Sequence, residues 1–230
     1  MTSLSRNARI AGLLYLLFSL IGAVRLLYIP SHLFVQGNAA ATAKNIVMHE
    51  SLFRWGIVCY LVGSAGWILV TLALYRLLRG VDQSLATLMV ILGSLVVVPI
   101  FFVNALNDVA ALLLARGGDF LGAFENPQRE ALAALFLRLH HHGDMANEIF
   151  WGLWLVPLGL LVYRSGFLPR FLGVWLMAAC VGYLALSFSG FLFPQFEDTV
   201  FSYAQPLTIG ELAFMLWLLI MGVKERSPAA

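Results

Sequence analysis

One stretch of this chain, Leu135–Tyr163, places three histidines, an aspartate and a glutamate at the start of a strongly apolar run. Residues three or four positions apart share one face of a helix. His140, Asp144 and Glu148 are spaced four apart, and His141 lies three positions before Asp144. Imidazole and carboxylate groups are ligands of first-row metals such as Zn. The spacing therefore predicts a helix face that can hold a divalent metal ion.

A bound metal ion would make this face a hydrolytic site, because it lowers the pKa of its bound water to about 7. The sequence lacks the H-E-x-x-H spacing of zinc peptidases. A metal-dependent intramembrane hydrolase acting on lipid is therefore one hypothesis among several, and whether the chain is an enzyme stays open.

Further ionisable and amide side chains lie toward one end of several apolar segments. An ionisable residue at the centre of a membrane span costs at least about 2.5 kcal/mol, so each one indicates a functional site. Together they predict a polar pocket, open to the outside, that binds a small ligand, a lipid head group or a metal ion. The residues of this predicted ligand pocket are Arg25, His49, Glu50, Arg54, Asn104, Asn107, Asp108, Asn147 and Glu211.

The same charges also fit a purely structural role. Buried charges in membranes usually pair with one another, so the acids can be partners of Arg25 and Arg54. Glu211 is one candidate partner of Arg25. The histidine run can equally be a polar cap at the membrane interface.

The composition places the chain in a membrane. Its hydrophobic fraction is 61%, compared with about 45–50% in soluble domains. Charged residues make up 11%, compared with about 25%. The net charge is only +2 and no basic patch is present, so nucleic acid is excluded as a partner and membrane lipid is expected. Cys59 and Cys180 lie inside apolar runs and indicate no disulfide framework.

Six segments reach the length of about 20 apolar residues that a membrane span needs. Each must be helical, because its backbone polar groups find no water in hydrocarbon. We predict one all-α integral-membrane domain over residues 1–230, with six transmembrane helices and short amphipathic helices on the outer side. Pro99 and Pro157 predict irregular helix within two spans. The predicted spans are Ile10–Ile29, Leu52–Tyr75, Leu85–Leu106, Asp144–Tyr163, Phe167–Phe191 and Pro206–Gly222.

The basic residues predict the orientation. Short loops on the cytoplasmic side of a membrane protein are enriched in Lys and Arg. Six spans put eight basic residues on one side and six on the other, and the eight lie close to helix ends. We therefore expect both termini to lie in the cytoplasm. The eight residues are Arg6, Arg9, Arg76, Arg79, Arg164, Arg170, Lys224 and Arg226.

Three connections carry recognisable signals. Gly37–Glu50 predicts a short interfacial helix with Asn38 as its cap. Arg116–Leu139 predicts an amphipathic helix that either lies on the outer surface or runs through Gly143 into the next span. In Tyr163–Gly173, a Gly-then-Pro pattern predicts a tight turn between two helices.

Several stretches resemble a widespread bacterial family of multi-pass membrane proteins described only as a domain of unknown function. They include ATAKNIVMHESLFRWGI (Ala41–Ile57) and, most specifically, IFWGLWLVPLGLLVYRSGFLPRFLGVWLMAACVGYL (Ile149–Leu184). The resemblance implies a six- or seven-helix inner-membrane protein and no assigned activity. It carries over His140, Glu50, Arg54 and the Ser165–Arg170 turn. His141, His142, Asp144 and Glu148 depart from the more apolar run of the family, which weakens the hydrolase hypothesis.

We therefore predict a membrane protein with an outward-facing polar pocket, with a lipid hydrolase, a small-solute transporter and a membrane interaction or sensory protein as alternatives. The cofactor is left open, with a divalent metal such as Zn at the metal face as the candidate. The inner halves of the spans are nearly uncharged, which counts against a continuous transport path. The sequence does not determine the substrate or the oligomeric state.

Overall fold

The computed structural model describes residues 3–223, and within that range it contains only helices and their connections. Six helical runs are long and apolar enough to cross a membrane. The prediction of an all-α, multi-pass membrane protein is therefore confirmed. Lys224 and Arg226, used above for the orientation, lie outside the described residues. The six runs are Ser3–Leu33, Glu50–Leu78, Gln83–Arg116, Asn126–Ser165, Arg170–Leu192 and Pro194–Ile220.

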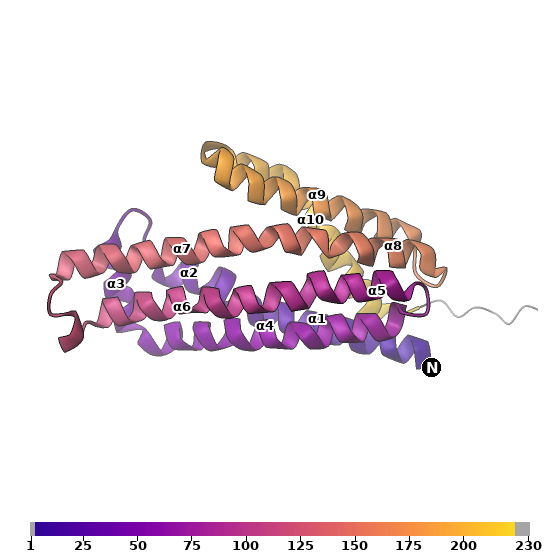
Figure 1. The fold of residues 1–230 in the computed structure, drawn as a ribbon, viewed down its shortest axis with the longest axis horizontal. Coiled ribbons are helices and arrows are strands. Elements are labelled where there is room, and N and C mark those ends of the chain that lie inside the picture. Colours follow the sequence, from indigo (N-terminus) through magenta and orange to yellow (C-terminus); the bar gives the residue numbers. More distant parts are fainter. Residues whose placement is uncertain (1–2, 224–230) are drawn as a thin grey trace, which may run out of the picture. The chain divides into compact units, whose positions relative to one another are not determined.

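Several of these runs are built from more than one helix (Figure 1). Two π-helical turns, η1 (Val24–Tyr28) and η2 (Ile91–Val96), and two 3-10 turns, η3 (Asp119–Leu121) and η4 (Pro194–Phe196), join or precede α-helices. The α-helices are α1 (Ser3–Ala23), α2 (Ile29–Leu33), α3 (Ala39–Met48), α4 (Glu50–Leu78), α5 (Gln83–Val90), α6 (Val97–Arg116), α7 (Asn126–Leu153), α8 (Leu155–Ser165), α9 (Arg170–Leu192) and α10 (Glu197–Ile220).

The chain divides into two compact units. Unit 1 comprises Met1–Phe18, Gly66–Val98 and Met145–Ala230, and unit 2 comprises Ser19–Ala65 and Pro99–Asp144. The unit boundaries fall inside long helical runs, so α4 and α7 each contribute residues to both units. We describe each unit by itself.

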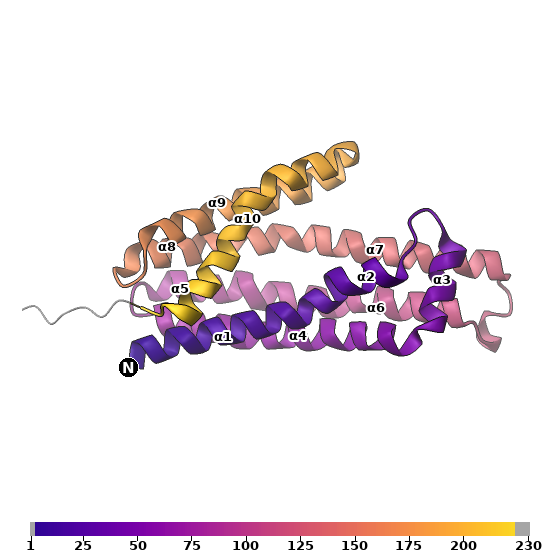
Figure 2. The same ribbon diagram turned by 180° about the vertical axis from the view of Figure 1, so that it is seen from behind.

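Unit 1 contains the larger apolar core. Trp154, Leu158 and Phe214 are buried at its centre. The helices α9 and α10 lie side by side in both ribbon views (Figures 1 and 2). α8 and α9 approach closely at Gly159 and Gly173, where a methyl group on Gly159 would lie 2.6 Å from the Gly173 carbonyl oxygen. Small residues at such crossings let membrane helices pack backbone to backbone.

The turn between α8 and α9 has the predicted chemistry. Gly166 ends α8 with a φ of 70°, a left-handed conformation that glycine adopts without strain. Pro169 lies directly before the first residue of α9 rather than inside its first turn. The Ser165 hydroxyl accepts a hydrogen bond from the Leu168 amide at 3.2 Å, which closes the turn.

Unit 2 is built around a smaller apolar core that includes Ile29, Ile46 and Phe53. The predicted interfacial helix is present as α3, and the Asn38 side chain caps it by accepting a hydrogen bond from the Ala41 amide at 2.9 Å. α7 runs without interruption through Gly143. Of the two alternatives predicted for Arg116–Leu139, the second is therefore observed: the amphipathic helix runs on into the next span.

Irregular helix precedes three prolines. A proline lacks an N–H, so the carbonyl four residues earlier loses its helical partner. For Pro30 that carbonyl belongs to Leu26 in η1, and for Pro99 it belongs to Leu95 in η2. For Pro157 it belongs to Leu153, where α7 ends before α8 begins. The predicted irregularities at Pro99 and Pro157 are therefore confirmed, and π-helical turns are one known way of absorbing such a break.

Candidate functional site

Six of the predicted site residues meet inside unit 2. With one tyrosine they form what we call the buried polar cluster. Arg25 comes from η1, the tyrosine from α4, the two asparagines and one aspartate from α6, and the histidine and the other aspartate from α7. The cluster consists of Arg25, Tyr60, Asn104, Asn107, Asp108, His140 and Asp144.

The centre of the cluster is an ion pair between Arg25 and Asp108. Arg25 Nε donates to Asp108 Oδ2 at 2.6 Å, and Arg25 Nη2 donates to Asp108 Oδ1 at 2.5 Å. The exposed fractions of the two side chains are 4% and 0%. Two parallel charge-assisted bonds of this kind fix the relative orientation of both groups. The pair joins η1 to α6 within unit 2.

His140 lies between the two carboxylates of the cluster. Its Nδ1 is 3.4 Å from Asp108 Oδ2, and its Nε2 is 3.3 Å from Asp144 Oδ2. Nδ1 is also 3.3 Å from the Asn104 carbonyl oxygen. Nε2 is buried and makes no hydrogen bond within the described residues. It therefore lies close to Asp144 without being hydrogen-bonded to it. The imidazole therefore has one unsatisfied ring nitrogen that faces a carboxylate.

Asp144 is held by uncharged donors. Tyr60 donates its hydroxyl hydrogen to Asp144 Oδ1 at 2.5 Å, and Asn104 Nδ2 donates to the same oxygen at 3.1 Å. Asn104 Nδ2 also donates to the His140 carbonyl at 2.9 Å. The Asn104 side chain on α6 is therefore bonded both to the backbone of His140 and to the side chain of Asp144 on α7.

The approach of α6 to α7 requires a glycine at position 143. A Cβ atom there would overlap the Asn104 side-chain amide, including its Cγ at 2.6 Å. Gly143 therefore allows the asparagine to reach both the His140 carbonyl and the Asp144 carboxylate.

The charges of the cluster do not balance while His140 is neutral. Asp108 has the Arg25 guanidinium as its partner, whereas Asp144 has no arginine or lysine within ion-pair distance in the part of the chain that the structure describes. One guanidinium thus faces two carboxylates. A single added positive charge would neutralise the cluster. The contact between Asp144 and His140 is the place where that charge is missing.

The other predicted pocket residues lie elsewhere. Glu50 and Arg54 form an ion pair at the start of α4, and His49 beside them is exposed. Asn147 and Glu211 belong to unit 1. The suggested pairing of Arg25 with Glu211 is wrong, because Arg25 pairs with Asp108.

Glu211 instead accepts hydrogen bonds from two tyrosines of unit 1. Tyr15 donates to one carboxylate oxygen, and Tyr183 donates to the other at 2.9 Å. The Tyr15 ring packs edge-on against Trp67, with 5.0 Å between ring centroids. We find no cationic partner of Glu211 among residues 3–223. The carboxylate thus ties α10 to α1 and α9.

The predicted metal face is only partly assembled. Of its four residues, His140 and Asp144 lie in the cluster, whereas His141 is exposed with its ring 5.7 Å from that of His142. Glu148 belongs to unit 1. Throughout the described range, no three His, Cys, Asp or Glu side chains are grouped so as to hold a metal ion.

Sequence reasoning missed the tyrosines. Tyr60, Tyr15 and Tyr183 lie in apolar runs, and none of them is among the site residues predicted from the sequence. A useful signal was available, since a tyrosine hydroxyl buried in a span needs a polar partner. The position of that partner in the sequence is not predictable from spacing, because Tyr60 and Asp144 are 84 residues apart.

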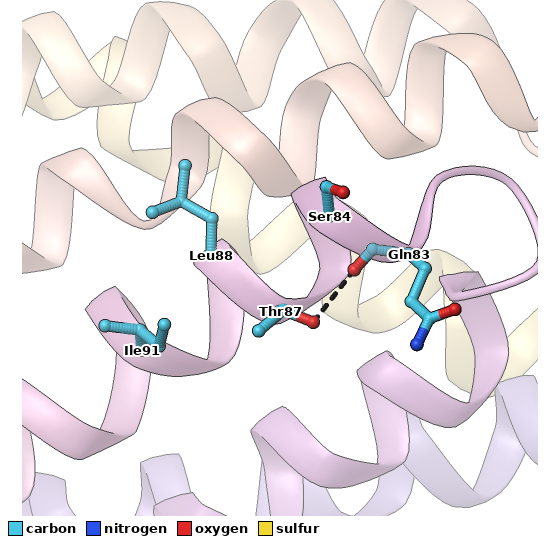
Figure 3. Close-up of a pocket in the computed structure, with 5 residues that line it drawn as sticks. All are labelled: Gln83, Ser84, Thr87, Leu88 and Ile91. Atoms are coloured by element: carbon cyan, nitrogen blue, oxygen red, sulfur yellow. Dashed lines mark hydrogen bonds between the residues drawn. The ribbon is translucent and has the colours of Figure 1, made fainter.

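A surface hollow on α5 is not a second site of this kind. Gln83, Ser84, Thr87, Leu88 and Ile91 line it, all from the start of one helical run (Figure 3). The Thr87 hydroxyl donates to the Gln83 carbonyl at 2.9 Å within the helix. The lining contains no ionisable group, so the hollow offers no charge for recognition.

The family described as "Domain of unknown function (DUF4386)" matches residues 10–222. A protein of Archaeoglobus fulgidus described as "Uncharacterized protein" is 39% identical over 79 residues, which are 33% of this chain and 44% of that relative. The alignment thus spans less than half the length of the relative. No solved structure matches the chain. The family match covers almost the whole chain and confirms the resemblance described above: the chain is a multi-pass membrane protein of the DUF4386 family.

Proposed function

We propose that this membrane protein binds one small cation, a proton or a monovalent metal ion, between Asp144 and His140. The observation that carries the proposal is the unbalanced charge of the buried polar cluster. A charged side chain in the membrane usually pairs with an opposite charge. Among residues 3–223 Asp144 lacks such a partner, and it lies next to a buried imidazole nitrogen without a hydrogen bond.

The groups around His140 define what the site recognises. Asp108 faces it from α6 and Asp144 from its own helix α7. Tyr60 faces it from α4, with 4.9 Å between ring centroids. Arg25 of η1 donates to both oxygens of Asp108. The carboxylate beside His140 that has no guanidinium partner among the described residues is therefore Asp144, on the Nε2 side of the imidazole.

This proposal favours an ion-responsive membrane protein, sensory or transporting, over the lipid hydrolase. The hydrolase needs a metal ion with several His or carboxylate ligands. The described part of the chain presents no such group. Chains of Asp, Glu and His within spans are typical of proton and ion pathways.

Cation-dependent thermal stability tests the proposal. The purified chain in detergent is unfolded with Na⁺, K⁺ or choline at one ionic strength, and separately without alkali ions at several pH values. A cation at one hundred times its Kd stabilises by about 2.7 kcal/mol, which is about 5–10 °C for a chain of this size. We expect a specific dependence on one alkali ion or on pH, and its loss in Asp144→Asn.

The matched control is Asp82→Asn, which removes a partly exposed carboxylate paired with Arg164 at 3.6 Å in unit 1. This variant should keep the wild-type cation or pH response. The series with different alkali ions tests for a bound metal ion, and the series at different pH values tests for a bound proton. If the cation is a proton, His140→Gln should abolish the pH response. Identical unfolding temperatures in all salts and at all pH values would refute the proposal.

We also propose a bacterial inner-membrane location with both termini in the cytoplasm. The support is the concentration of arginines in short connections next to helix ends. A membrane-impermeant thiol reagent applied to intact cells should label Asn38→Cys and leave Gln83→Cys unlabelled, in a background without Cys59 and Cys180. The opposite pattern would reverse the orientation.

A further inference from the structure

Two arginines share one glutamate where α4 begins and α6 ends, at the same end of unit 2 (Figures 1 and 2). Arg54 Nε lies 2.6 Å from Glu50 Oε1, and Arg116 Nε lies 3.4 Å from Glu50 Oε2. We call Arg54 and Arg116 the arginine pair. We propose that the arginine pair binds the phosphate group of a phospholipid head group.

The first argument is charge. Two guanidiniums and one carboxylate leave one net positive charge at this position. Glu50 carries a single negative charge, so its carboxylate cannot neutralise both guanidiniums. A phosphodiester carries one negative charge and would balance the group. Anions of this shape accept bidentate hydrogen bonds from guanidinium groups.

The second argument is the supply of donors. Arg54 donates to Glu50 through Nε, Arg116 lies near Glu50 through Nε, and no hydrogen bond joins their Nη groups to residues 3–223. The two side chains are 51% and 48% exposed. The arginine pair thus presents several partly exposed N–H donors that have no hydrogen-bond acceptor among residues 3–223.

The third argument is the surroundings, which indicate lipid rather than a soluble partner. Trp55 follows Arg54 and is 65% exposed, and Met48 at the end of α3 is also 65% exposed. On α6, Leu113 lies one turn before Arg116 and is exposed as well. Guanidiniums at the ends of spans, beside exposed tryptophan and aliphatic side chains, lie at the level of the head groups in a bilayer.

A second surface pair in the chain provides a matched comparison. Arg164 lies 3.6 Å from Asp82, and the side chains are 55% and 32% exposed. The distance and exposure resemble those of Arg116 and Glu50, but one arginine here meets one carboxylate. This pair has no net charge, so it should not attract a phosphate group.

Native mass spectrometry of the full chain in detergent tests the proposal. The probes are phosphatidylglycerol, diacylglycerol with the same acyl chains, and inorganic phosphate. We expect phosphatidylglycerol to bind more tightly than diacylglycerol. The double variant Arg54→Gln/Arg116→Gln should bind phosphatidylglycerol at least about tenfold more weakly, because the loss of even one charge-assisted hydrogen bond has about that effect. Arg164→Gln should bind as the wild type does.

A variant with the opposite sign keeps the test decisive if the double variant folds poorly. Glu50→Gln removes the competing carboxylate and should strengthen phosphatidylglycerol binding severalfold. Unchanged or weaker binding in Glu50→Gln would overturn the proposal, as would an equal loss in Arg164→Gln. Displacement of the lipid by inorganic phosphate at equal concentration would identify a free anion as the ligand and overturn it too.

Discussion

The ion pair between Arg25 and Asp108 gives the sharpest test of the buried polar cluster. Its side chains are 4% and 0% exposed and are joined by bonds of 2.6 and 2.5 Å. Removing one member leaves the other buried without its counter-charge. Such losses cost about 3–5 kcal/mol, compared with about 0–1 kcal/mol for an exposed pair. Arg25→Gln should therefore lower the unfolding temperature by roughly 6–20 °C.

The double variant Arg25→Gln/Asp108→Asn distinguishes pairing from simple packing. It removes both charges while keeping side-chain size close to the original. The free energy of unfolding should recover much of the loss, because no uncompensated charge remains. The assay is a double-mutant cycle of unfolding in mixed micelles, and we expect a coupling energy above about 1.5 kcal/mol.

The control for this cycle is Arg54→Gln, in which the ion pair lost is about half exposed. It should change the free energy of unfolding by no more than about 1 kcal/mol. Two results would refute the reasoning. One is a loss for Arg25→Gln as small as that of the control, and the other is strict additivity of the two single variants.

Two further predictions concern packing and hydrogen bonding. Gly143→Ala should destabilise the protein by about 1–3 kcal/mol in thermal unfolding, because the new methyl group overlaps the Asn104 amide. Gly22→Ala, also within a helix but with nothing within 4 Å of the added atom, should be neutral, and equal losses in both would contradict the packing argument. Tyr183→Phe should cost about 1–3 kcal/mol, since one Glu211 oxygen loses its donor in unit 1. Tyr163→Phe, at an exposed tyrosine, is its control, and no difference between the two would count against a structural hydrogen bond.

Local features of this protein could be predicted from the sequence. The apolar runs determine the helices, because a backbone in hydrocarbon must satisfy its own hydrogen bonds. Interactions between residues close in the sequence are accessible to the same reasoning: Asn38 caps α3, Gly166 ends α8, and Glu50 pairs with Arg54 one turn later. His140 and Asp144 are four residues apart, so their proximity also follows from helix geometry.

Partners distant in the sequence were decided only by tertiary structure. Arg25 and Asp108 are 83 residues apart, and Tyr15 and Glu211 are 196 apart. A membrane helix is apolar on most of its surface, so the pattern of its residues does not indicate which face meets a neighbour. The choice of Asp108 as the partner of Arg25 depends on close packing within unit 2, where for example the missing side chain of Gly143 admits Asn104. The sequence by itself determined which segments are helical and which carry charge, and packing decided which charges meet.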